Sequence, residues 1–130
     1  MATAGPTYRR IVLKVSGEGF AGPGGFGIHS EALGHTTNEI RQVHEAGIQI
    51  AIVVGGGNIV RGGTFVRQCE MAEATAHHMG MLGTVINGLA LQETLERAGV
   101  QARVLSALAS LRSVSLSIGA SASVIWRKGV

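Results

Sequence analysis

Short apolar runs alternate along the chain with longer segments whose core-type residues recur at helical spacing. Residues 8–17 hold a short β-branched run and residues 48–54 a second apolar run, so both predict strands. Between them, residues 30–46 predict a helix with Ser30 as its N-cap and Gly47 as the residue that ends it. The spacing that supports this helix is that of Leu33, Thr37, Ile40 and Val43.

A second helix is predicted over residues 74–98, and Gly99 closes it. The segments 45–53 and 97–105 share an Ala-Gly-(Ile/Val)-Gln core, which in both places leads from a helix end into a short strand. This repeated helix–glycine–strand order is typical of one α/β domain with a parallel sheet. The apolar residues expected along one side of the second helix are Met79, Leu82, Ile86, Leu89 and Leu95.

The apolar run at residues 51–54 stops on three consecutive glycines, which are followed by Asn58 and then Arg61. Four buried-type residues in a row predict a strand covered on both faces. Glycines after such a strand let the backbone approach a ligand closely or adopt a positive φ. Bare amides beside a guanidinium favour an anion, most often a phosphate.

A second loop of this kind follows the first predicted strand. The stretch "LKVSGE", residues 13–18, places Lys14 and Ser16 at the strand end, although a lysine there is also typical of a solvated strand terminus. Ligands of open α/β sheets bind at the carboxyl ends of the strands. The two loops together therefore predict a phosphate site at one edge of the sheet.

Three other patterns do not predict a site. The stretch "GEGFAG", residues 17–22, fits the dinucleotide fingerprint, but Pro23 and two glycines follow it where a helix would have to begin, so we interpret it as a chance match. No P-loop motif is present. We expect no metal site in this chain, because His77 and His78 point about 100° apart on a helix and the other histidines lack partners at ligand spacing.

The composition narrows the class of protein. The chain has 130 residues, a net charge of +3, eight acidic residues and 4% aromatic residues, with its arginines scattered, which argues against nucleic-acid binding. No apolar stretch is long enough to span a bilayer or to form a signal peptide, so we expect no membrane association. The chain has a single cysteine, Cys69, which we expect to be a free thiol. We therefore expect the protein to be cytoplasmic.

Four segments in order carry a resemblance to a known family: "LKVSGE", "GFGI", "IVVGGGNIVRG" and "TAHHMGMLGTVINGLALQETLERAGV". From about Tyr8 to Ala107 the chain resembles bacterial uridylate kinase (UMP kinase), in the amino-acid-kinase superfamily. The resemblance implies a three-layer αβα sandwich with a mainly parallel sheet and a homohexamer. It also implies transfer of the γ-phosphoryl group of ATP to UMP in pyrimidine (CTP) biosynthesis, with Mg²⁺ accompanying ATP and with GTP and UTP as effectors.

The same resemblance assigns residues to the site. Lys14 and Arg61 are expected to be catalytic, and the segment linked to GTP would be Gly22, Pro23, Gly24, Gly25, Phe26 and Gly27. Gly56 and His77 would contact UMP, although His77 stands where the family commonly has an aspartate, and a neutral imidazole accepts only one hydrogen bond. The expected ATP-binding set is Lys14, Val15, Ser16, Gly17, Gly57 and Arg61.

The amino-acid composition of the chain changes after Leu105. Residues 106–130 hold seven of the nine serines and no acidic residue. We therefore expect residues 1–107 to be the UMP-binding N-terminal part of the kinase domain and residues 108–130 to be a frameshifted, non-homologous tail. A one-base shift through "SVIWRKGV", residues 123–130, allows Arg-His-Leu-Glu-Lys-Gly-Arg, a run that resembles the family.

Without its second half, the sheet is expected to lack neighbouring strands and covering helices. Long apolar edges would then make the chain prone to association, and we expect no kinase turnover from it. The alternative interpretation is a non-catalytic remnant that binds nucleotide or forms an oligomer interface. A carbamate or glutamate kinase is disfavoured, because "MGMLGTVINGLALQ" resembles the UMP kinase helix.

Overall fold

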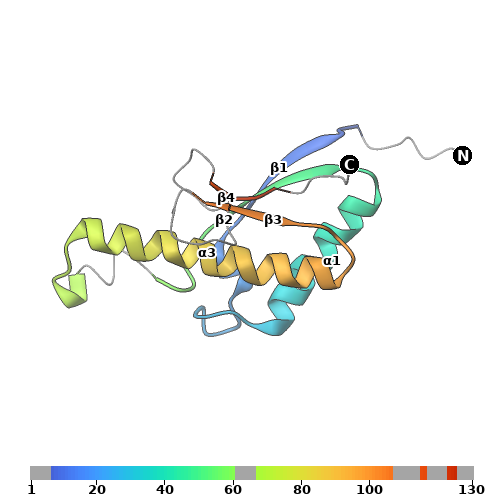
Figure 1. The fold of residues 1–130 in the computed structure, drawn as a ribbon. Helices are drawn as coiled ribbons and strands as arrows, with labels where there is room; N and C mark the ends of the chain where they lie inside the picture. The colour runs from blue at the N-terminus through green and yellow to red at the C-terminus, as the bar shows by residue number, and fades with distance from the viewer. Residues whose placement is uncertain (1–6, 61–66, 107–114, 117–122, 126–130) are drawn as a thin grey trace, which may run out of the picture.

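The computed structural model describes residues 7–60, 67–106, 115–116 and 123–125. The predicted strands and helices are confirmed to within two residues at most ends (Figure 1). The elements are β1 (Arg10–Val15), the 3₁₀ turn η1 (Gly17–Phe20), α1 (Ser30–Glu45), β2 (Gln49–Val54), α3 (Glu73–Arg97), β3 (Arg103–Ser106), β4 (Ser115–Leu116) and β5 (Ser123–Ile125).

The two helix ends follow the predicted glycine chemistry, whereas the start of α1 differs by one residue. Gly47 and Gly99 both have a φ of +83°, the left-handed conformation that ends a helix. The prediction of Ser30 as N-cap is wrong, because His29 is the extended N-cap residue and makes no side-chain capping bond. The His29 N–H donates to the carbonyl of Phe20 at 2.8 Å, so backbone pairing with η1 fixes where the helix begins.

The sheet has the strand order β1-β2-β5-β3-β4. β1 pairs with β2 and β3 pairs with β4 in parallel, and β5 runs antiparallel between β2 and β3. The α/β class is confirmed. The sequence predicted that the sheet would lack neighbouring strands, but β2 has β5 as its second neighbour. The β-branched pair in β5, Val124 and Ile125, suits a strand, and β5 lies in the segment that the sequence predicted as a tail.

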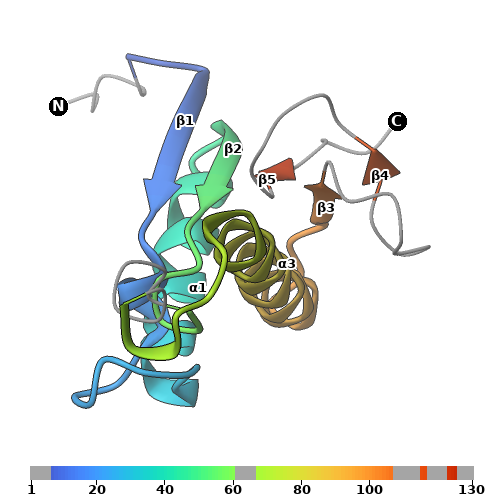
Figure 2. The ribbon, with the colours of Figure 1, turned by 90° about the vertical axis from the view of Figure 1, so that its left-hand side faces the viewer.

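Both helices pack on one face of the sheet (Figure 2). Strand β2 alternates between half-buried and buried positions, and its buried residues Ile50, Ile52 and Val54 join a core that includes Leu33, Ile40, Leu91 and Leu95. On the opposite face, Val12 is 75% exposed. The described residues therefore supply the helical layer of one face only.

The prediction of which side of α3 packs is wrong for the middle of the helix. Leu82 and Ile86 are 48% and 46% exposed, although Leu95 is buried as expected. The helix is apolar on several sides, so the pattern alone does not select the face that packs. The structure selects the side with small residues, which lets the helix backbone come close to a neighbouring loop; the buried set is Ala76, Gly83, Val85, Asn87, Gly88, Leu91 and Leu95.

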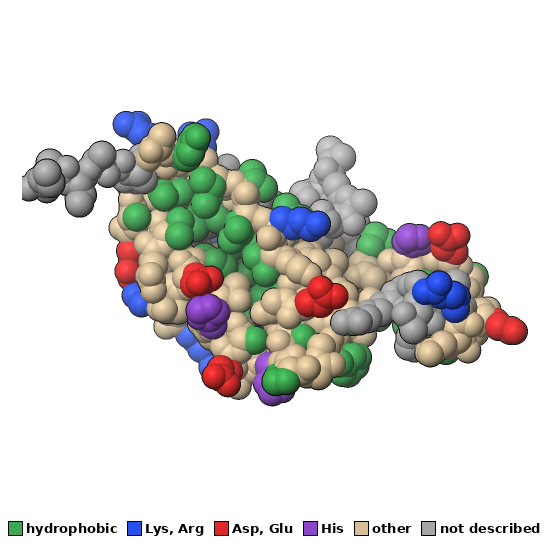
Figure 3. All heavy atoms as spheres, turned by 180° about the vertical axis from the view of Figure 1, so that it is seen from behind, with side chains coloured by type: hydrophobic (Ala, Val, Ile, Leu, Met, Phe, Trp, Pro, Cys, Tyr) green, Lys and Arg blue, Asp and Glu red, His purple; other side chains and the backbone are tan. Residues whose placement is uncertain are grey.

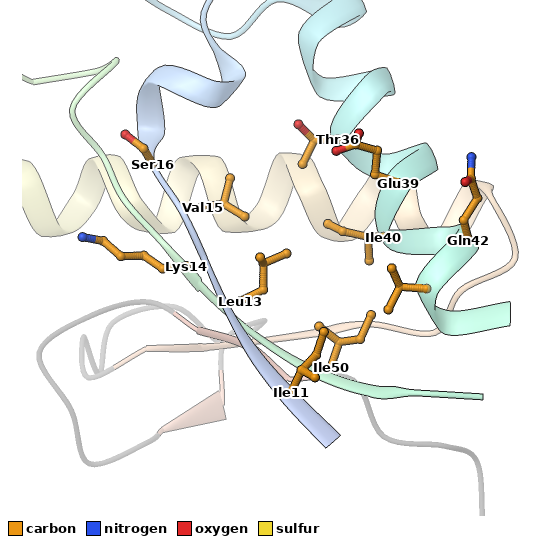
Figure 4. Close-up of a pocket in the computed structure, with 11 residues that line it drawn as sticks. Ile11, Leu13, Lys14, Val15, Ser16, Thr36, Glu39, Ile40, Gln42 and Ile50 are labelled. Atoms are coloured by element: carbon orange, nitrogen blue, oxygen red, sulfur yellow. The ribbon is translucent and has the colours of Figure 1, made fainter. Parts of the chain in front are cut away.

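Along the free side of β1, a groove of about 590 Å³ separates this strand from α1. Seen from behind, apolar side chains gather in this region of the surface (Figure 3). Its floor is formed by Ile11, Leu13 and Ile50, with Ile40 and Val43 on the helix (Figure 4). No helix within the described ranges has both the length and the apolar character needed to cross a bilayer. Cys69 is exposed and free, as expected.

Candidate functional site

The two loops singled out in the sequence meet at the carboxyl ends of β1 and β2. The parallel register sets Lys14 opposite Val53 and Val15 opposite Val54. Immediately beyond this pair, the Gly55 N–H donates to the carbonyl of Val15 at 2.9 Å. The prediction that both loops share one edge of the sheet is therefore confirmed.

Close backbone contact explains the glycine in the first loop. A Cβ atom at Gly17 would lie 2.5 Å from Asn58 Oδ1 and 2.7 Å from the nitrogen of Gly57. Any side chain here would force the loops apart, since real Cβ atoms do not approach other atoms this closely. Gly17 thus allows the loop after β1 to lie directly on the loop after β2.

The three consecutive glycines after β2 have different surroundings. A Cβ atom at Gly56 would lie 2.8 Å from the carbonyl oxygen of Gly80 and 2.8 Å from the nitrogen of Thr84, both in the backbone of α3. A Cβ atom at Gly55 would lie 3.0 Å from the nitrogen of Gly17. Packing therefore requires a glycine at position 56 and favours one at position 55, a role that the sequence pattern did not indicate.

Gly57 has open space instead. The nearest atom to a Cβ atom placed there is Glu18 Oε1 at 4.0 Å. The N–H groups of Gly57 and Asn58 donate to no backbone carbonyl in the described part of the chain, whereas those of Ile59 and Val60 both donate to the carbonyl of Gly56. Gly57 is therefore the glycine at which a ligand can approach the backbone.

Lys14 is the second-last residue of β1, opposite Val53 on β2. Figure 4 shows its side chain extending away from α1, whereas Leu13 and Val15 on the same strand point toward the helix. Lys14 is exposed and forms no hydrogen bond or ion pair with another described residue. Nearby, the Ser16 hydroxyl donates to Glu18 Oε2 at 3.4 Å. The ammonium of Lys14 is thus available for an anionic ligand.

The other predicted site residues are placed less directly. His77 is exposed on the first turns of α3, with Nε2 3.5 Å from Glu73 Oε1, and it precedes Gly80 by three residues. His77 thus lies on α3, the same helix whose backbone Gly56 contacts at Gly80 and Thr84. Arg61 lies outside the described residues. In the described ranges no cluster of three or more His, Cys, Asp or Glu side chains suits a metal ion.

The glycine segment between η1 and α1 contacts the loop after β2. Gly25 and Gly27 have φ values of +69° and +75°, which only glycine adopts without strain. The Gly27 N–H donates to the carbonyl of Asn58 at 2.8 Å, and Phe26 is 75% exposed beside it. The segment that the resemblance linked to GTP therefore lies against the candidate phosphate loop.

Comparison with known proteins places the chain. A sequence model described as "Amino acid kinase family" matches residues 9–127. The chain belongs to this family. Among curated family members, it is 48% identical over 103 residues to a uridylate kinase of Dichelobacter nodosus, covering 79% of this chain and 42% of that protein. It is 53% identical over 100 residues to a uridylate kinase of Rubrobacter xylanophilus, covering 77% and 39%.

Solved structures of amino acid kinases agree with this fold. The UMP kinase from Bacillus anthracis gives a TM-score of 0.79 at 33% identity, over 85% of this chain and 46% of that one. The UMP kinase from Ureaplasma parvum gives 0.78 at 33% identity, over 87% and 49%. A carbamate kinase from Giardia lamblia, at 14% identity and a TM-score of 0.52, shows the fold alone. The chain spans less than half the length of these relatives.

The sequence of this amino acid kinase chain did not predict that two of its asparagines, Asn58 and Asn87, form a pair. Asn58 and Asn87 are both fully buried and hydrogen-bonded to each other across the loop and α3. A signal was present, because Asn87 interrupts the apolar run "TVINGLAL" in the middle of a helix, where asparagine is a poor helix former. The partner 29 residues earlier is visible only once the loop is folded onto the helix.

The different surroundings of the glycines predict different effects of alanine. Gly56→Ala pushes a methyl group into the α3 backbone, so we expect it to lower the free energy of unfolding by about 1–3 kcal/mol. Gly57→Ala meets open space at a φ outside the left-handed region, so we expect a change within about 1 kcal/mol. Urea unfolding of the two variants measures both values. Equal destabilisation would contradict the packing assigned to Gly56.

Proposed function

We propose that this chain is the nucleotide-binding N-terminal part of a UMP kinase, the enzyme that transfers the γ-phosphoryl group of ATP to UMP to give UDP. One observation carries the proposal most directly. The loops after β1 and β2 meet and offer, at one edge, the open Gly57 backbone and the Lys14 ammonium, which pairs with no other described residue. The named relatives, about half identical over the shared part, support uridylate as the phosphoryl acceptor.

The chemistry suits what these groups can do. Phosphoryl transfer depends on holding the phosphates in line and on stabilising their charge, which backbone N–H groups and cations supply. We assign the ATP phosphates to Lys14, to the backbone of Val15, Ser16 and Gly17, and to Gly57. Arg61 is assigned to the phosphates by its position three residues after Asn58.

The UMP side of the proposed site is formed by Gly56 and His77. Because the α-carbon of Gly56 packs against α3, only its peptide groups are left to contact a ligand. His77 lies on the same helix and is assigned to the ribose, to which its neutral ring offers one acceptor nitrogen. We expect weaker discrimination of the ribose hydroxyls than a carboxylate at this position would give.

Kinases of this kind use ATP with a divalent cation, and we propose Mg²⁺. The chain contains no aspartate, and its described residues do not form a cluster of ligands for such an ion. Mg²⁺ in kinases is commonly held by one or two carboxylates together with the substrate phosphates. We therefore assign no residue of this chain to the cation.

A second candidate function is that of a non-catalytic module that binds nucleotide or forms an oligomer interface. The observations that favour it are the share of the relatives that the chain covers, 39–49%, and the exposed apolar pair Leu82 and Ile86 on α3. From the resemblance to UMP kinases we also propose that the chain's full-length form is a homohexamer. We further propose that GTP and UTP regulate it, with the Gly22–Gly27 segment as the part linked to GTP.

Lys14 gives a direct test of the phosphate site in a full-length enzyme whose second half is restored after residue 107. We expect Lys14→Ala to lower kcat by at least about 100-fold, because it removes a charge that stabilises the transferring phosphoryl group. Arg10→Ala is the matched control, since Arg10 is a cation on the same face at the other end of β1 and bonds Gln49 Oε1. A coupled assay of ADP formation measures both. Near-native turnover of Lys14→Ala would remove the assignment.

The tail gives a genetic prediction. We propose that residues after about 107 are a frameshifted reading and that the 130-residue product makes no UDP. Sequencing the gene tests this, since we expect the neighbouring frame across codons 123–130 to encode Arg-His-Leu-Glu-Lys-Gly-Arg. A frame that does not encode this run, or a cooperatively melting 130-residue product with kinase activity, would refute it.

A further inference from the structure

Asn58 and Asn87 form a reciprocal amide pair in the interior. Both residues are 0% exposed. The Nδ2 group of Asn58 donates to Asn87 Oδ1 at 3.1 Å, and the Nδ2 group of Asn87 donates to Asn58 Oδ1 at 2.6 Å. Each side chain is thus both donor and acceptor to the other, across the gap between the loop after β2 and the middle of α3.

The remaining amide protons reach two further backbone segments. Asn58 Nδ2 donates to the carbonyl of Gly27 at 2.8 Å, and Asn87 Nδ2 donates to the carbonyl of Gly55 at 2.7 Å. All four side-chain N–H groups of the pair therefore have acceptors. Exchanging oxygen and nitrogen in either amide would set oxygen against a carbonyl oxygen, so the network fixes both orientations.

The pair holds the candidate phosphate loop on both sides of Gly57. Asn87 binds the carbonyl of Gly55, two residues before Gly57, while Asn58 is the next residue after it. The Oδ1 atom of Asn58 also lies against Gly17, where a Cβ atom would approach to 2.5 Å. The peptide planes around Gly57 are therefore set by side chains that themselves contact no open surface.

The pair is not explained by the stability of the core alone. Two buried polar partners replaced together by apolar groups of similar shape often cost a protein little stability. A fully satisfied buried network instead specifies one geometry among the elements that it joins. Here those elements are the loop after β2, helix α3 and the glycine segment before α1.

Gly27 gives this network an exposed end. Asn58 bonds Gly27 twice, through its side chain to the Gly27 carbonyl and through its own carbonyl to the Gly27 N–H. The preceding turn is closed by the Gly25 N–H, which donates to the carbonyl of Gly22 at 2.9 Å, and it carries the exposed Phe26 at its tip. Movement of this turn therefore acts on Asn58, the residue that follows Gly57.

We propose that Asn58 and Asn87 are positioning residues that aim the Gly57 N–H at a nucleotide phosphate and couple it to the turn at residues 25–27. The identity of the ligand rests on the proposed function, whereas the coupling does not. The role is one of geometry, so it is separable from a contribution to stability.

A double-mutant cycle in the 130-residue chain tests the aim of the amide. We expect Asn58→Leu and Asn87→Leu each to lower the melting temperature, because each leaves the buried Oδ1 atom of the other asparagine without its donor, and the double variant to regain part of the loss. Affinity for UMP and for ATP, each titrated separately, is expected to fall by about tenfold in all three variants. Wild-type affinity in the double variant would show that the pair only packs the core.

Thr37→Val is the matched control for this cycle. It removes a part-buried side-chain bond of 2.7 Å between Thr37 on α1 and Thr94 on α3, away from the phosphate loop. We expect a lower melting temperature with unchanged nucleotide affinity. An equal loss of affinity in Thr37→Val would mean that affinity follows stability, and the positioning role would be overturned.

A measurement without nucleotide tests the coupling. Gly27→Ala strains the positive φ of the turn, while its methyl group meets no atom within 4 Å. We expect the amide NMR resonance of Gly57 to move in the otherwise unchanged chain and to move less when Asn58→Leu and Asn87→Leu are also present, because only the backbone bond from the Gly27 N–H to the carbonyl of residue 58 then remains. Equal shifts in both backgrounds, or no shift in either, would overturn the proposal.

Two safeguards keep these outcomes distinct. If the double variant does not melt cooperatively, Asn87→Ala replaces it. The smaller alanine side chain leaves a cavity and does not crowd the loop as leucine could. If the unmodified chain binds neither UMP nor ATP, the proposed function of this chain fails, and the Gly27→Ala resonance test still decides the coupling.

Discussion

The contact between glycine backbones at the ends of β1 and β2 is the constraint on which the site depends. Gly17 lies on Gly57 and Asn58, and Gly56 lies on the backbone of α3 at Gly80 and Thr84. Three segments far apart in the sequence are brought to within contact distance only because none of these glycines carries a side chain. The loop after β2 is thereby fixed between β1 and α3, and the α-carbon of Gly57 is left facing open space.

This contact changes the meaning of the glycine run. From the sequence, all three glycines after β2 were explained by the approach of an anion. In the structure, Gly55 and Gly56 serve to pack the loop, and Gly57 alone combines open space with an N–H group that pairs with no described backbone carbonyl. The phosphate hypothesis is thus narrowed to a single position flanked by a buried asparagine pair.

Local chemistry made part of this architecture predictable. Gly47 and Gly99 mark helix ends, and the apolar runs mark β1 and β2, because each of these features depends on neighbours in the sequence. The packed face of α3, the asparagine pair and the place of β5 in the sheet depend on contacts between distant segments. Helix α3 in particular carries apolar residues on several sides, and in its middle the small residues Gly83 and Gly88 lie on the packed side while Leu82 and Ile86 are exposed.

The central claim is that a nucleotide phosphate binds at the loops after β1 and β2. Titrating the ¹⁵N-labelled chain with ATP and following its amide resonances tests this most directly. The account predicts that the largest shifts fall on Gly57 and Asn58, with a second group at Ser16 and Gly17. Shifts confined to the groove between β1 and α1, with Gly57 unchanged, would contradict it.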